Sequence, residues 1–579
     1  MTELQDRLLT LLKEIDTLCR DNGIEFYLAA GTALGAVRHK GFIPWDDDAD
    51  ICMTKSNWEK FAKLKYKLPA NRELVSMDFD YNCGYTINRY VDSSSMRLYR
   101  YHCASPQPAG ILIDILVLDP LPNSQEAVDH YNKHLTEYCD MLVTATVHAH
   151  RSPFETSYMK YWFLSKIIGR NKTLDYMRKK TFCYDENEDT YYYAQRDGVV
   201  PHVWKKSVYG KPKYVPFEDT YMPIAECYYE HLSEAFDEEW MYVPEMINRE
   251  EHIKTLDFNI SYNNAMNDFA RLVDRSTLDP MYQKRQRLGN LNGSLIKKQV
   301  RKSLQLSEAM TQLKYEKNPV DSGELLQHLN DSDHEFLDEY FKEYEELQTS
   351  KNCIGGCAVK DWLRSRVPYY VDIDDQFLYV FLRNYMHKGH ISKAKRIMQA
   401  RENKRELSDG LKEIKELIYN IIECGSLMSK GEYATCNEIA HNILRSYPEN
   451  LYGKRLYYSS LFFLGPSSSY PSLQKELEEI ADNDDVLLAV LSEIYWKGNR
   501  YQDAFSLYRK IADISNHGLV LFHIKERLET MDEEIKAVID PTEYEELLLY
   551  VQSCLGDEEA RQYFDDEEDP SSDNDEDNN

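Results

Sequence analysis

The feature that most constrains this chain is a run of four aspartates within the five residues 46–50, interrupted only by Ala49. Neighbouring carboxylates repel one another, so such a run is tolerated at a solvated turn or around a cation. Asp48 and Asp50 alternate about Ala49 and are followed by the apolar Ile51. On an extended chain, residues two apart point to the same side. The pattern therefore predicts a shared divalent ion, with a solvated acidic loop as the alternative.

The segment that precedes the aspartates is suited to an anion. Gly31, Thr32 and Gly35 predict a glycine-containing turn whose backbone amides approach a phosphate, with the threonine hydroxyl as a further donor. Arg38 follows, and its guanidinium fork matches phosphate geometry. Mg²⁺ takes few protein carboxylates and fills its shell with water and phosphate oxygens. Together these residues predict phosphoryl transfer to or from a nucleotide, with Mg²⁺ (or Mn²⁺) as the cofactor.

A third acid, Asp114, stands alone in the apolar run 111–118, which predicts a strand. A buried carboxylate without a partner is costly, so Asp114 is expected to pair with a metal ion or another cation. It could also accept the proton of an incoming hydroxyl. The alternative is a hydrogen-bonded structural aspartate near the end of a strand.

Apolar periodicity predicts a mixed α/β opening. Leucines and isoleucine recur at spacings of three and four over the first 20 residues, which indicates an amphipathic helix. We expect helices from residue 56 to Pro69 and over 124–180, and an irregular aromatic stretch over 191–219. Strands are expected at 24–29, 50–53, 73–77, 85–91 and 111–118. The prediction is an α/β (α+β) catalytic domain with a mixed sheet over 1–260, then a helical connector over 261–370.

The C-terminal third has a degenerate repeat. Gly431, Gly465 and Gly498 lie 34 and 33 residues apart, and with Gly389 each separates two helical patterns. This period matches tetratricopeptide-like (TPR-like) helical hairpins, so an all-α, TPR-like region is predicted over 371–556, with an ordinary helical bundle as the alternative. Residues 557–579 carry twelve acidic side chains and one arginine, which predicts a disordered, solvated tail.

Composition narrows the class of protein. The chain has 98 acidic and 69 basic side chains, a net charge of −29, which argues against a protein that coats nucleic acid. We find no apolar run long enough to cross a bilayer, and the first residues are acidic where a secretory signal is basic. Cysteines are scattered, and the close pair Cys353 and Cys357 lacks the second ligand pair of a zinc site. A cytoplasmic protein is expected, with peripheral attachment to the inner face of the membrane left open.

The passage from Gly31 to Ile51 resembles the signature of the LicD family, which includes the fukutin-related proteins. The similarity is long and ungapped there and extends over about residues 1–250. It implies a nucleotidyltransferase-like fold and a phosphotransferase that moves a phospho-alcohol, most often phosphocholine, from a CDP-activated donor to a hydroxyl of a cell-surface glycan, such as lipopolysaccharide or teichoic acid, with release of CMP.

The resemblance also implies roles for particular residues. Asp48, Asp50 and Asp114 would be the catalytic, metal-binding acids. Gly31, Thr32 and Arg38 would contact the donor phosphates and nucleotide. Arg89 fits a basic cluster of the family and joins Gly35 among the substrate-binding candidates.

Two other classes of function stay open on the sequence. One is a nucleotidyltransferase on another small molecule or a nucleic acid, with the same metal chemistry and attack at the nucleotide phosphorus. The other is a catalytically decayed interaction protein whose TPR-like repeats do the work. The expected partners are a CDP-alcohol donor (CDP-choline favoured) and a glycan or glycolipid acceptor. A protein partner for the repeats is left open, and no nucleic acid is expected.

Overall fold

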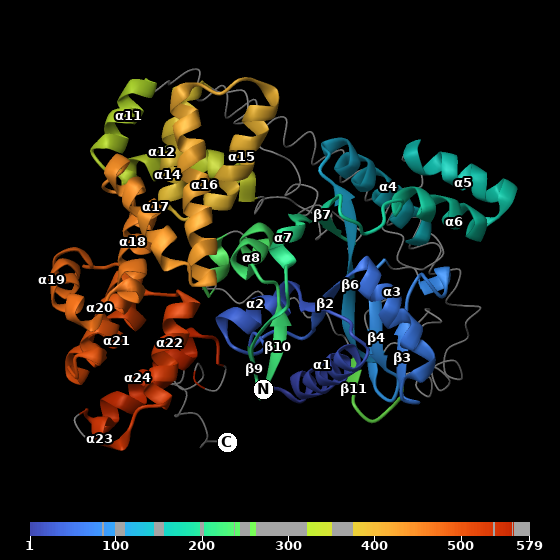
Figure 1. The fold of residues 1–579 in the computed structure, drawn as a ribbon, viewed down its shortest axis with the longest axis horizontal. Helices are drawn as coiled ribbons and strands as arrows, with labels where there is room; N and C mark the ends of the chain where they lie inside the picture. Colours follow the sequence, from blue (N-terminus) through green and yellow to red (C-terminus); the bar gives the residue numbers. More distant parts are fainter. Residues whose placement is uncertain are drawn as a thin grey trace, which may run out of the picture.

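The computed structural model describes residues 1–83, 86–98, 110–143, 156–196, 202–236, 238–243, 255–261, 321–349, 374–536, 539–557 and 560. These residues form an N-terminal part built on a sheet and a C-terminal part made of helices, which lie side by side in Figure 1. The expected mixed sheet and helical C-terminal region are confirmed. Apart from residues 557 and 560, the predicted tail at 557–579 falls outside the described residues, as does much of the predicted connector.

A seven-stranded mixed sheet forms the centre of the N-terminal part. Its main path runs β1-β2-β6-β4-β3, with β7 on the far half of β6 and β8 on β7. Strand β2 is parallel to β6, and the other neighbours are antiparallel. The strands are β1 (Tyr27–Leu28), β2 (Asp50–Thr54), β3 (Arg72–Val75), β4 (Asn88–Asp92), β6 (Ile111–Pro122), β7 (Thr190–Gln195) and β8 (Val203–Lys205).

Helix α1 (Glu3–Asp21) packs its leucine stripe on this sheet, as its periodicity predicts. Leu8, Leu12 and Ile15 are fully buried in the main core. Thr2 caps the helix through a capping box with Gln5, which satisfies two amides of its first turn. Helix α3 (Lys55–Ala62) and the 3₁₀ turn η1 (Lys63–Lys67) follow β2. This core includes Ile43, Ala49 and Ile51, so the aspartate run is anchored in the core at both ends.

Further elements cover the edges of the sheet. The helices are α4 (Gln125–Val143), α5 (Thr156–Ile168), α6 (Arg170–Thr181), α7 (Lys206–Tyr209) and α8 (Tyr228–Phe236), with the 3₁₀ turns η2 (Tyr81–Cys83) and η4 (Glu238–Met241). Two small ladders pair β9 (Lys213–Phe217) with β10 (Thr220–Ile224) and β5 (Met96–Leu98) with β11 (Thr255–Asp257). The expected helices over 124–180 are confirmed for the residues of this span that the structure describes, 124–143 and 156–180. The stretch 191–219, expected to be irregular, contains strands and a helix instead.

The C-terminal part is helical throughout its described residues. It comprises α11 (Ser322–Asn330), α12 (His334–Thr349), α14 (Asp375–His387), α15 (Ile391–Lys404), α16 (Asp409–Lys430), α17 (Tyr433–Ser446), α18 (Leu451–Leu464), η6 (Ser467–Ser469), α19 (Tyr470–Ile480), α20 (Asp485–Lys497), α21 (Tyr501–Ile514), α22 (Gly518–Glu529), α23 (Glu533–Lys536) and α24 (Pro541–Cys554). Each of the four repeat glycines lies between two helices, as predicted. The TPR-like assignment itself stays a prediction.

The turn expected at Gly31 and Gly35 is wrong. Both glycines lie inside helix α2 (Ala30–Arg38). Alanine and leucine, strong helix formers, make up most of the rest of the segment and offset the two glycines. Gly35 is needed for packing, because a Cβ there would come within 2.4 Å of the backbone oxygen of Gly41. The strand expected at 24–29 is also shorter and is reduced to β1.

The helical part packs directly on the loop that joins α2 to β2. Lys40 forms an ion pair with Glu526 of α22, at 2.6 Å between Nζ and Oε1. The Trp45 ring lies against Gly556, just after α24, closely enough that a Cβ there would overlap it. Gly425 of α16 lies equally close to the ring of Tyr229 on α8. The aspartate run therefore lies next to the joint between the two parts.

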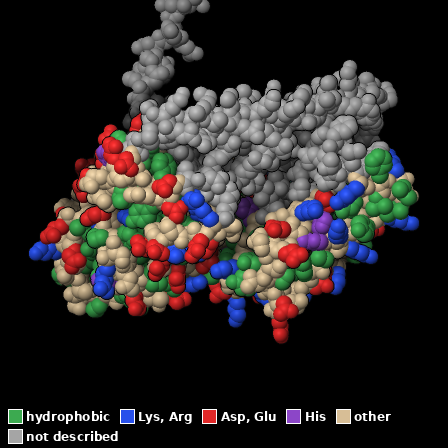
Figure 2. Space-filling view, turned by 90° about the horizontal axis from the view of Figure 1, so that it is seen from above, with side chains coloured by type: hydrophobic (Ala, Val, Ile, Leu, Met, Phe, Trp, Pro, Cys, Tyr) green, Lys and Arg blue, Asp and Glu red, His purple; other side chains and the backbone are tan. Residues whose placement is uncertain are grey.

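Figure 2 views the molecule from above. On this face acidic and basic side chains are interspersed over both described parts, so the surplus of negative charge is spread out there. Within the described residues, the helices are too short or too polar to cross a membrane.

The close approach at Gly35 gives a test of the fold around the aspartate loop. Gly35→Ala should lower the free energy of unfolding by about 1–3 kcal/mol, because the added methyl meets backbone that cannot move aside. Gly410→Ala is the matched control. Its methyl would have ordinary contact distances to Tyr379, so it should leave stability unchanged or raise it by up to about 1 kcal/mol. Urea denaturation of both variants measures this, and equal effects would contradict the packing described here.

Candidate active site

The parallel pairing of β2 with β6 places two of the predicted acids side by side. Asp50 is in register with Asp114, and the amide of Asp114 donates to the carbonyl oxygen of Ala49 at 3.0 Å. Side chains of register partners point to the same face of a sheet. The first residue of β2 and the fourth residue of β6 therefore present their carboxylates together.

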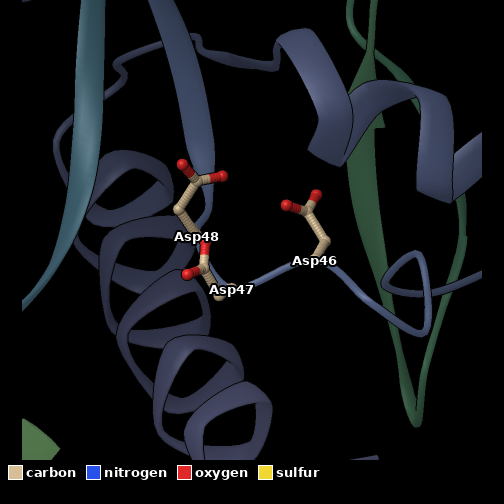
Figure 3. Close-up of side chains that lie close together, drawn as sticks. All are labelled: Asp46, Asp47 and Asp48. Atoms are coloured by element: carbon tan, nitrogen blue, oxygen red, sulfur yellow. The ribbon is translucent and has the colours of Figure 1, made fainter. Parts of the chain in front are cut away.

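The loop before β2 adds three more carboxylates to this end of the sheet. Asp46, Asp47 and Asp48 each offer an oxygen within 4.8 Å of the others, which is close enough to share one metal ion. Figure 3 shows that all three side chains project from the loop that leads into β2. Among the described residues this trio meets that distance criterion, whereas the predicted trio of Asp48, Asp50 and Asp114 stays a prediction.

Burial and mutual repulsion perturb these acids. The pKa of Asp46 is raised to about 7, first because the carboxyl is desolvated and then because Asp48 and Asp47 are nearby. The pKa of Asp50 is raised well above its ordinary value, first by desolvation of the carboxyl and then by the charges of Asp48, Asp114 and Asp46, in that order. Repulsion among closely set hard oxygen donors is the condition that a divalent cation relieves. The donor set therefore fits Mg²⁺ or Mn²⁺.

The N-terminus of α2 lies against these acids. The hydroxyl of Thr32 accepts a hydrogen bond from the amide of Asp50 at 2.9 Å. A Cβ on Gly31 would come within 2.8 Å of a carboxylate oxygen of Asp46. The cap residue Ala29 makes no side-chain cap hydrogen bond, so the first-turn amides are not covered by it. A helix N-terminus of this kind attracts anions, as expected for a phosphate next to a metal.

The backbone is strained where α2 begins. Ala30 has a φ of 44°, in the left-handed region that residues with a Cβ rarely adopt. Such strain is retained where the surrounding structure fixes it, and it is frequent at functional sites. Here it turns the chain from β1 into α2, so that the helix begins next to Asp50.

The loop is fixed from two sides. The Gln5 side chain of α1 is buried, and its Nε2 lies 3.1 Å from the carbonyl oxygens of Ile43 and Asp46. On the other side, Glu218 at the turn between β9 and β10 accepts a hydrogen bond from the amide of Phe42 at 2.8 Å. The loop that carries the aspartates is thus held by hydrogen bonds from α1 and from the turn between β9 and β10.

The remaining predicted residues are spread more widely. Arg89 lies opposite Asp114 on β4, and its Nε donates to Oδ1 of Asp114 at 2.9 Å, so it belongs to the same cluster. Gly31 and Thr32 are at the helix N-terminus that faces the acids. Gly35 lies against the loop after α2. Arg38 lies at the other end of α2 and donates to the carbonyl oxygens of Trp240 and Tyr242. Substrate contact stays a prediction for all five.

Asp46 is the residue that the sequence interpretation undervalued. Asp46 is not among the acids predicted above to bind the metal, yet its carboxylate is desolvated and lies against both Gly31 and the other acids. The available signal was the length of the aspartate run. Alternation about Ala49 singles out Asp48 and Asp50, but a loop before a strand can bring a further residue to the same side.

Comparison with known proteins bears on this site. Residues 23–115 match the family model described as the LicD/FKTN/FKRP nucleotidyltransferase domain. The match supports membership of the LicD family for this segment of the chain. The match begins before β1 and ends one residue after Asp114, so it spans the strands and the helix that assemble the acidic cluster. No solved structure matches the chain significantly.

Three curated relatives show where the similarity lies. The lipopolysaccharide cholinephosphotransferase LicD of Haemophilus influenzae is 28% identical over 122 residues, which are 21% of this chain and 44% of that protein. An uncharacterized protein of Rickettsia typhi is 36% identical over 72 residues, 11% of this chain and 23% of the relative. An uncharacterized protein of Rickettsia prowazekii is 51% identical over 41 residues, which are 7% of this chain and 15% of that relative. The chain matches less than half the length of each relative.

The raised pKa values predict how pH and metal ions affect stability. The pKa of Asp46 is about 7 in the folded chain and 3.8 ordinarily, so the folded state retains a proton that the unfolded state loses. The contribution of Asp46 to the free energy of unfolding is fully present below about pH 4 and is lost as the pH rises to about 7. Mg²⁺ should restore it, so its effect on the melting temperature should be larger at about pH 8 than at about pH 5.5.

Thermal melts with Mg²⁺ or EDTA at the two pH values measure this effect. Asp48→Ala should remove most of the Mg²⁺ effect, and Asp21→Asn, at an exposed acid of α1, should retain it. An equal shift in wild type and Asp48→Ala would place the ion elsewhere.

Proposed function

We propose that this protein is a metal-dependent phosphotransferase of the LicD type. It transfers a phospho-alcohol, with phosphocholine favoured, from a CDP-activated donor to a hydroxyl of a glycan and releases CMP. The observation that carries the proposal is the register of Asp50 with Asp114 beside Asp48, directly in front of the N-terminus of α2. The similarity to a named cholinephosphotransferase supports this class of reaction.

The acids would hold the metal. Asp48, Asp50 and Asp114 are the proposed ligands, and Asp46 is close enough to replace one of them or to orient a bound water. A bound Mg²⁺ supplies charge neutralisation of the donor diphosphate. Arg89 holds the Asp114 carboxylate through its Nε, which fixes the direction in which that carboxylate points. Rigid placement of this kind is most of what phosphoryl transfer asks of a protein.

The N-terminus of α2 would bind the donor phosphates. Gly31 permits close approach because a side chain there would meet Asp46. The Thr32 hydroxyl already fixes the backbone of Asp50, so it ties the phosphate-binding helix to the metal-binding strand. The first-turn amides would then face an anion that lies next to the metal.

The glycan acceptor and the choline group rest on the family alone. The matched residues end at residue 115, and the acceptor specificity of a transferase is set by the residues around its site. A cytoplasmic location and a protein partner for the helical part likewise stay predictions.

The direct test is transfer by the purified full-length chain. With Mg²⁺, CDP-choline and a lipopolysaccharide or teichoic acid acceptor, it should release CMP, and EDTA should stop the release. Asp48→Ala and Asp50→Ala should each lower the rate more than about 100-fold, since loss of even an outer partner of a metal ligand commonly costs 10- to 100-fold. Asp21→Asn is the control and should retain the wild-type rate.

Two results would contradict the proposal. One is undiminished CMP release by the Asp48 and Asp50 variants while they remain folded by circular dichroism. The other is release of pyrophosphate from a nucleoside triphosphate with no turnover of any CDP-alcohol, which indicates a nucleotidyltransferase instead.

A further inference from the structure

A cavity of about 700 Å³ lies between the two parts of the molecule. Helix α2, the loop after it and the segment around η4 form one wall, and helices α14 and α18 contribute to the other. This volume is in the range of small-molecule sites, about 300–1,000 Å³. The residues matched to the LicD family supply only part of one wall. The cavity therefore depends on how the N-terminal part and the helical C-terminal part of this chain pack together.

The lining of the cavity is basic and aromatic. It includes Arg38, Lys388 and Arg455, and no aspartate or glutamate is among the described residues that line it. Two of these cations have carboxylate neighbours. Arg455 is paired with Asp484 and Asp485, both at 2.9 Å. Lys388 has Asp338 at 3.5 Å. The charged side chains among the described lining residues are therefore all basic, in a chain whose net charge is −29.

Arg38 is the cation of the lining without such a neighbour. It is only 3% exposed, and among the described residues no carboxylate lies within ion-pair distance of its guanidinium. Nη1 donates to the carbonyl oxygens of Trp240 and Tyr242, at 3.0 and 2.9 Å. Nε faces Nδ1 of the neighbouring His39 at 3.4 Å. These contacts account for Nη1 and Nε and leave the two Nη2 protons without an acceptor in the described part of the chain.

Nη2 is not among the described polar atoms that are both sealed from solvent and without a partner, and Arg38 is one of the residues that line the cavity. Burial lowers the pKa of Arg38 to about 10, which still leaves it charged at neutral pH. A buried guanidinium without a counter-ion is costly, and an oxyanion in the cavity would remove that cost.

We propose that this cavity binds an organic phosphate, with the phosphate on Nη2 of Arg38 and a ring against the aromatic wall. Trp45, Trp240, Tyr242 and Tyr452 supply flat faces there, which suit a nucleobase or a sugar ring. Guanidinium donors match phosphate oxygens in geometry as well as charge.

This position differs from the metal end of α2. Arg38 is six residues after Thr32, about 9 Å along the helix at 1.5 Å per residue. A phosphate at Arg38 is therefore a second anion position, occupied by the far end of the donor or by a phosphorylated sugar of the acceptor. The inference does not require transfer activity.

Isothermal titration of the full-length protein in EDTA tests the cavity without the metal. The probes are CMP and glucose 6-phosphate, with cytidine and glucose as their uncharged counterparts. One phosphate should bind at least about 10-fold more tightly than its uncharged counterpart, the value of a charged hydrogen bond. Tighter binding of CMP assigns the cavity to the donor, and tighter binding of glucose 6-phosphate assigns it to the acceptor. No preference for either phosphate overturns the proposal.

Two variants on opposite walls locate the binding. Arg38→Met removes the cation, but it also removes bonds that hold the segment around η4. Leu451→Trp fills the cavity from α18 and leaves those bonds in place. Both should abolish the preference for phosphate, and Asp48→Ala, at the metal end, should retain it in EDTA. If Leu451→Trp binds as wild type while Asp48→Ala does not, the phosphate lies at the aspartates and the inference is wrong.

Discussion

The parallel pairing of β2 with β6 is the interaction on which the rest of the site depends. It brings Asp50 and Asp114, distant in sequence, to one face of the sheet in exact register. A shift of one residue would turn one of the two carboxylates to the opposite face. The apolar residues that follow, from Ile51 to Met53 and from Ile115 to Val117, are buried and fix this register. The hydrophobic core therefore offsets the repulsion between the acids.

The helical C-terminal part contacts the segment next to these acids. It contacts the loop between α2 and β2 through the Lys40–Glu526 ion pair and the Trp45–Gly556 contact, and Gly518 at the start of α22 lies against the Arg38 side chain. The segment with the family signature is thus enclosed by residues far outside the family match. Both parts therefore contribute to the sites proposed above, since one supplies the acids and both enclose the neighbouring cavity.

Local sequence patterns predicted most of the helices and strands in the described part of the chain. The apolar run around Asp114 gave a correct strand, and the leucine stripe of the first 20 residues gave a correct helix, because periodicity reports burial directly. The turn at Gly31 and Gly35 was wrong, since a glycine in a helix can be required by a tertiary contact, here with Gly41. The surroundings of Arg38 could not be predicted, because its partners at 240, 242 and 518 are brought near only by the fold.

The central claim is that one divalent ion is held where β2 and β6 present their acids. Anomalous diffraction at the manganese edge, from crystals of the full-length protein soaked in Mn²⁺, tests it most directly. The account predicts a peak within coordination distance of Asp48 and Asp50, with Asp114 or Asp46 beside it. Ordered aspartates with no peak among them, or a peak only at another site, would contradict it.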